Sequence, residues 1–73
     1  MIKRLEKGIA TGSGKYREQL YADTASELAG VTEIDGEILD CGSAAICADG
    51  ELCLLDSAGV WHKKDGTVVT AND

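Results

Sequence analysis

Two closely spaced turn signals within one apolar stretch constrain the fold more than any other feature of this sequence. They lie in residues 42–64, GSAAICADGELCLLDSAGVWHKK, where Asp49-Gly50 and Asp56-Ser57-Ala58-Gly59 interrupt short apolar runs. Apolar runs separated by such turns are typical of antiparallel hairpins. The stretch therefore predicts a three-stranded antiparallel meander and leaves little room for an active site.

The turn chemistry also predicts which side chains share a face of the meander. A type I turn at Asp56, followed by a left-handed Gly59, sets Leu55 opposite Trp61. A two-residue turn at Asp49-Gly50 pairs Ile46 with Cys53 and Cys47 with Leu52, whereas a three-residue loop would set Cys47 opposite Cys53. One face then holds Ala44, Ile46, Cys53, Leu55 and Trp61. The other face holds Ala45, Cys47, Leu52, Leu54, Val60 and His62.

Both predicted faces are largely apolar, whereas a sheet with one face in water should alternate apolar and polar residues. Two apolar faces need two covers, and one short helix supplies one of them. We expect a second subunit to supply the other. The predicted subunit interface consists of Leu52, Leu54, Val60 and His62. The predicted core consists of Ile46, Leu55, Trp61 and Leu28.

The rest of the chain divides into an arm, a small domain and a tail. Residues 1–15 contain Gly8, Gly12 and Gly14 and predict a flexible basic arm. Residues 16–66 predict the β domain, which begins with a strand over residues 16–22, and residues 67–73 predict a C-terminal tail. The predicted fold is mostly β (α+β), built from antiparallel hairpins and the meander, with one short helix.

The short helix is predicted over residues 25–29. Thr24-x-x-Glu27 matches the capping-box pattern, and Gly30 is a natural C-terminal stop. A helix this short must pack on the sheet through its apolar side chains to be stable. Beyond it, Asp35-Gly36 predicts a two-residue hairpin within residues 31–39.

Length, charge and composition indicate which classes of partner this chain could bind. The 73 residues carry a net charge of -6 and include no Phe. A chain this short makes a marginal core of its own, which favours an oligomer. The acidic balance argues against nucleic acid, and no apolar run is long enough to span a membrane. Three cysteines without a secretion signal predict reduced thiols in a cytosolic compartment.

Four apparent chemical motifs lack the spacing or the partner residues that their chemistry requires, so we expect no enzyme, no metal and no cofactor. The phosphate-loop pattern around Gly14-Lys15 would need Gly at Ile9 and Ser or Thr at Tyr16. The acidic loops lack EF-hand spacing. His62 has no nucleophile with which to form a triad. Cys41, Cys47 and Cys53 could form a zinc site with His62, but these cysteines lack the Cys-x-x-Cys spacing that is typical of such sites.

The chain resembles small proteins from the head gene clusters of tailed phages and prophages. The resemblance covers roughly residues 20–64 and follows the pattern D-T-x-x-E-L, then G-S-x-A, then L-D-S-x-G-x-W. These motifs begin at Asp23, Gly42 and Leu55 in this sequence. Cys53 stands where the pattern often has Tyr.

This resemblance implies a non-enzymatic virion or assembly role, such as a minor head protein, a decoration protein or an assembly chaperone. It also implies homo-oligomers such as rings, with phage head proteins as further partners and a location in the virion or the bacterial cytoplasm. An alternative, drawn from the sheet itself, is a small regulatory or peptide-binding module that uses an open sheet edge.

Overall fold

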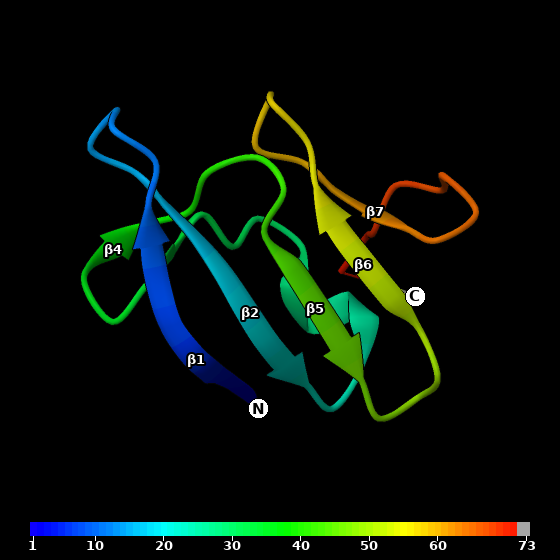
Figure 1. Cartoon of the computed structure of the whole chain (residues 1–73). Coiled ribbons are helices and arrows are strands. Elements are labelled where there is room, and N and C mark those ends of the chain that lie inside the picture. The colour runs from blue at the N-terminus through cyan, green and yellow to red at the C-terminus, as the bar shows by residue number, and fades with distance from the viewer. Residues whose placement is uncertain (72–73) are drawn as a thin grey trace.

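The computed structural model describes residues 1–71 and shows a mostly β chain, as the sequence predicts (Figure 1). Five strands form one mixed sheet in the order β1-β2-β5-β6-β7, and β3 and β4 form a separate hairpin. The helical element within these residues is a 3-10 turn, η1 (Ala25–Leu28). The strands are β1 (Ile2–Ala10), β2 (Tyr16–Ala22), β3 (Glu33–Ile34), β4 (Glu37–Ile38), β5 (Ala44–Cys47), β6 (Leu52–Leu55) and β7 (Trp61–Lys63).

Strands β5, β6 and β7 form the predicted antiparallel meander. Leu55 lies opposite Trp61 and Leu54 opposite His62, so the predicted register of β6 against β7 is confirmed. Gly59 has a φ of 82°, in the left-handed region that a non-glycine residue rarely adopts. This turn therefore fixes the β6–β7 pairing as its chemistry predicts.

The predicted register of β5 against β6 is wrong by one residue. Ile46 lies opposite Leu52, and Ala45 lies opposite Cys53. The cause is a three-residue loop in place of the expected two-residue turn. Gly50 closes this loop with a φ of 95° and donates its N–H to a β5 carbonyl at 3.0 Å.

A shift of one residue exchanges the two faces of a strand, because side chains alternate between them. Ala45 and Cys47 are buried on the core face, where Cys47 lies on the same side as Cys53 without standing directly opposite it. Ala44 and Ile46 lie on the other face. Ile46 is 53% exposed, so its assignment to the core is wrong.

Residues 1–15 do not form a flexible arm, and this domain prediction is wrong. Strand β1 pairs antiparallel with β2 at one edge of the sheet. Its glycine-rich continuation is the loop of the β1–β2 hairpin, in which Gly12 and Gly14 have φ values of 91° and 80°. Thr11 donates its N–H to the carbonyl of Lys15 at 3.1 Å across that loop. The β domain therefore begins before residue 16.

The segment between the parallel strands β2 and β5 covers one face of the sheet. In Figure 1, η1 lies behind β5 and β6. It buries Ala25 and Leu28 against the sheet. The Glu27 carboxylate accepts the N–H of Thr24 at 3.0 Å, which supplies one half of the predicted capping box. The predicted helix is thus present as a shorter 3-10 turn.

The β3–β4 hairpin has the predicted two-residue turn. Asp35 and Gly36 both have positive φ values, 50° and 83°, as a type I′ turn requires. Ile34 pairs with Glu37 on either side of the turn.

The core lies between the sheet and this covering segment. It contains Leu28, Leu55 and Trp61 from the predicted core, and the Trp61 ring donates its Nε1–H to the carbonyl of Val31 at 2.9 Å. Part of the predicted tail is also packed, because Val69 is 5% exposed. Residues 72–73 of that tail lie outside the described residues. The core residues are Leu20, Ala22, Ala25, Leu28, Leu39, Ala45, Cys47, Cys53, Leu55, Trp61 and Val69.

Candidate interaction surface

One face of the sheet carries apolar side chains that no other element covers within residues 1–71. Ile46, Leu52 and Leu54 are 53%, 50% and 58% exposed, and they come from the adjacent strands β5 and β6. Ala44 lies directly opposite Leu54 on the same face. We call this surface the open face. Contiguous exposed apolar residues of this kind mark interaction sites more often than isolated ones do.

The open face is hollowed between β5 and β6. The hollow has a volume of about 300 Å³, and its walls are almost wholly apolar. Lys64, which follows β7, supplies the one cation among its lining residues. The hollow is lined by Ala44, Ala45, Ile46, Leu52, Cys53, Leu54 and Lys64. An apolar side chain of a partner would find dispersion contacts here together with one cation.

The four residues predicted as an interface have different surroundings in the structure. Leu52 and Leu54 lie together on the open face, where Ile46 joins them because of the corrected register. Val60 is 36% exposed and lies at the turn before β7. His62 is paired with Leu54, and its ring is held by other groups of the same chain. Gly50 was the sequence signal that could have placed Ile46 on the open face, because a left-handed glycine can also close a three-residue loop.

Both ring nitrogens of His62 are engaged. Nε2 lies 2.6 Å from the Asp56 carboxylate, and Nδ1 lies 3.2 Å from the carbonyl of Gly66. Both partners are acceptors, so the doubly protonated ring satisfies both contacts at once. The hydrogen bond to Asp56 raises the pKa of His62 accordingly. This histidine is therefore a clamp between two turns, and its geometry does not suit a general base.

A buried carboxyl group lies beneath β1. The side chain of Glu18 is 0% exposed, and neither carboxyl oxygen has a hydrogen-bond partner within residues 1–71. Arg4 approaches it to 3.8 Å through Nε, and the same side chain donates to Glu37 at 2.9 Å. Burial raises the pKa of Glu18, and the neighbouring Glu37 carboxyl adds to the rise. This cluster fastens β1 to β2 and β4.

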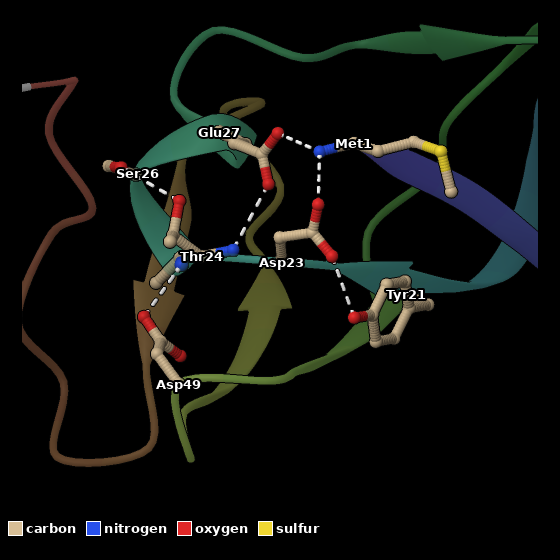
Figure 2. Close-up of polar contacts among 8 residues, drawn as sticks. Met1, Tyr21, Asp23, Thr24, Ser26, Glu27 and Asp49 are labelled. Carbon is tan, nitrogen blue, oxygen red and sulfur yellow. Dashed lines mark hydrogen bonds and ion pairs between the residues drawn. The ribbon is translucent and has the colours of Figure 1, made fainter.

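A second acidic cluster fastens the start of β1 to η1 (Figure 2). The α-amino group of Met1 donates to Glu27 and, at 2.9 Å, to Asp23. The hydroxyl group of Tyr21 donates to the same Asp23 carboxylate at 2.7 Å. These contacts lower the pKa of Asp23, with the Tyr21 bond as the main cause. The cluster consists of satisfied pairs and lies at the surface.

The three cysteines are free thiols in two environments. Cys41 is exposed, and Cys47 and Cys53 are buried on the core face. Burial raises the pKa of Cys47 to about 12, with Cys53 as the next cause. Thiols of high pKa are poor nucleophiles and weak metal ligands at neutral pH. Within residues 1–71, no group of three or more His, Cys, Asp or Glu side chains is arranged to hold a metal ion.

An exposed apolar surface such as the open face can bind apolar side chains of a partner. Among residues 1–71, no helix has the length and apolar character needed to cross a bilayer. Comparison of the chain with protein-family models, with curated proteins and with solved structures finds no match.

Proposed function

We propose that this protein is a non-enzymatic assembly protein that binds copies of itself through the open face. The observation that carries the proposal is the apolar surface formed by Ile46, Leu52 and Leu54, each half exposed, in a chain of only 73 residues. Covering this surface with another subunit would remove apolar area from water, which is favourable by about 25 cal/mol per Å².

The phage resemblance gives the proposal its biological setting. Residues 20–64, which carry the resembling motifs, form η1 and the meander that displays the open face. We propose a minor head, decoration or assembly-chaperone role, in the virion or in the host cytoplasm, with phage head proteins as the further partners.

Light scattering on purified protein tests the self-association. We expect the wild-type chain to show a multiple of its 7.6 kDa mass, and Leu54→Asp to show the mass of one chain. Leu54 is exposed, so the variant should keep its fold, which circular dichroism can verify. Leu5→Asp is the matched control, because Leu5 is 46% exposed on the edge strand β1. A wild-type mass of one chain at about 100 µM would overturn the proposal, since the binding free energy would then be weaker than about 5.5 kcal/mol.

The alternative function, a peptide-binding module, would use a different surface, the outer edge of β1. Within the described residues β1 pairs only with β2, so its other edge is open. Two register shifts and the exposed cations Lys3 and Lys7 interrupt that edge, and such features oppose the addition of a strand. A monomer whose Leu5→Asp variant loses a bound peptide would favour this alternative.

A further inference from the structure

The open face has the opposite charge to the chain as a whole. Register and position place Lys3, Arg17 and Lys64 on it, all exposed, together with the acid Glu6. At its end Asp56 adds a second acid, which is paired with His62. The chain carries -6 in total, so the remaining surface is strongly acidic. A partner that suits the open face should therefore combine an apolar side chain with carboxylates.

A symmetric face-to-face pair does not meet that requirement. An isologous contact brings the same patch of both copies together. Because the exposed cations of the open face outnumber its acids, such a pair would bring two positively charged surfaces together. Like charges brought together in this way oppose association.

The β3–β4 hairpin of the same chain has the complementary character. Ile38 is 47% exposed on β4, and Glu33 lies directly opposite it across the hairpin. The turn adds the exposed Asp35, which Arg4 of β1 approaches to 3.8 Å, and no Lys or Arg occurs from residue 18 to residue 62. Figure 1 shows this hairpin beside β1, at the opposite side of the sheet from β6 and β7. The hairpin and the hollow are thus well separated on one molecule.

We infer that copies of this chain associate head to tail, with Ile38 of one copy in the hollow of the next. The carboxylates around Ile38 then face the cations of the open face, Lys64 first among them. This inference rests on the proposed self-association and specifies which two surfaces meet. A heterologous contact leaves one hairpin and one hollow unused at the ends, so further copies add until a ring closes or a filament grows.

Complementation between two variants tests the arrangement. Leu54→Asp spoils the hollow and keeps the hairpin, whereas Ile38→Lys spoils the hairpin and keeps the hollow. We expect each variant alone to show the mass of one chain, and an equimolar mixture to form a pair of about twice 7.6 kDa. In nuclear magnetic resonance titrations, labelled Leu54→Asp protein should shift at residues 33–38, and labelled Ile38→Lys protein should shift at β5 and β6.

A charge exchange gives an independent readout. Lys64→Glu should weaken the association at least tenfold, and adding Glu33→Lys to the same chain should restore part of it. Leu5→Asp again serves as the control that leaves association unchanged.

The outcomes separate this inference from the proposed function. Oligomeric Ile38→Lys protein beside monomeric Leu54→Asp protein would overturn the head-to-tail arrangement and leave the open face as the interface. Two monomeric variants that fail to combine would also overturn it. A monomeric wild-type chain would remove the proposed function and this inference together.

Discussion

The backbone of Gly8 passes directly over the buried carboxyl group of Glu18. A Cβ atom built on Gly8 would lie 2.6 Å from Cδ of Glu18 and 2.7 Å from its Oε1, well inside van der Waals contact. The pairing of β1 with β2 shifts register between Glu6 and Ile9, which is where this close approach occurs. Glycine is needed here for space, since the site has no room for a side chain.

Replacing that glycine should loosen β1. We expect Gly8→Ala to lower the free energy of unfolding by about 1–3 kcal/mol, the range for overpacking a closely packed site. Urea titration followed by Trp61 fluorescence measures the change. Lys7→Ala is the control, because Lys7 is exposed next to the site. If the loss persists unchanged in a Glu18→Ala background, the contact between these two residues is not its cause.

The pH dependence of stability should reveal the buried carboxyl group. The pKa of Glu18 is raised above its ordinary value of 4.5, so above pH 4.5 the folded state holds this proton more firmly than the unfolded state does. The stability that Glu18 contributes is then complete below pH 4.5 and falls as the pH rises through the folded-state pKa. Glu18→Gln removes this titration.

We therefore expect the stability of Glu18→Gln relative to wild type to increase with pH above about 4.5 in urea unfolding. The exposed Glu6→Gln change on β1 should show no such trend. A difference between Glu18→Gln and wild type that stays constant from pH 4 to pH 8 would contradict the prediction.

The clamp, which is the ion pair between His62 and Asp56, should stabilise the fold most at mildly acidic pH. The pKa of His62 is raised above 6.5 by its bond to Asp56, so its contribution is complete below pH 6.5 and is lost as the pH rises through the folded value. The pKa of Asp56 is lowered below 3.8, chiefly by the N–H of Val60, so its contribution is lost as the pH falls below 3.8. The clamp is strongest between these two limits.

Asp56→Asn should remove the charge while its side-chain oxygen still accepts the N–H of Val60. We expect the variant to lose most stability near pH 5 and less near pH 8, measured by thermal unfolding at both values. Equal losses at the two values would show that the ion pair with His62 contributes nothing.

The thiols should differ in reactivity. Cys41 is exposed, whereas burial raises the pKa values of both Cys47 and Cys53. Iodoacetamide at pH 8 should therefore modify one thiol quickly and the other two at the much slower rate of local opening. Mass spectrometry of timed samples counts the modified thiols, and Cys41→Ser should abolish the fast phase. Rapid modification of two thiols in the wild-type chain would contradict the placement of the buried pair.

Turn chemistry was the part of the sequence that translated most directly into structure. The left-handed Gly59 and the positive φ values at Asp35-Gly36 are local requirements, and both turns form as predicted. Asp49-Gly50 shows the limit of that reasoning. The same dipeptide closes a two-residue turn at residues 35–36 and a three-residue loop at residues 48–50, because both loops accept a left-handed glycine.

Sequence alone determined the mostly β class, the meander and the capped turn at Thr24, because each depends on residues near one another in the chain. It also determined the acidic balance, which is a property of composition. Only the tertiary structure decided that the N-terminal segment is a strand over Glu18, and that Ile46 faces outward while Cys47 faces the core. These outcomes depend on contacts between distant segments. The loop length between β5 and β6 decides which face of β5 packs against the core that contains η1 and Trp61. Whether the N-terminal segment joins the sheet likewise depends on its contacts with a distant strand.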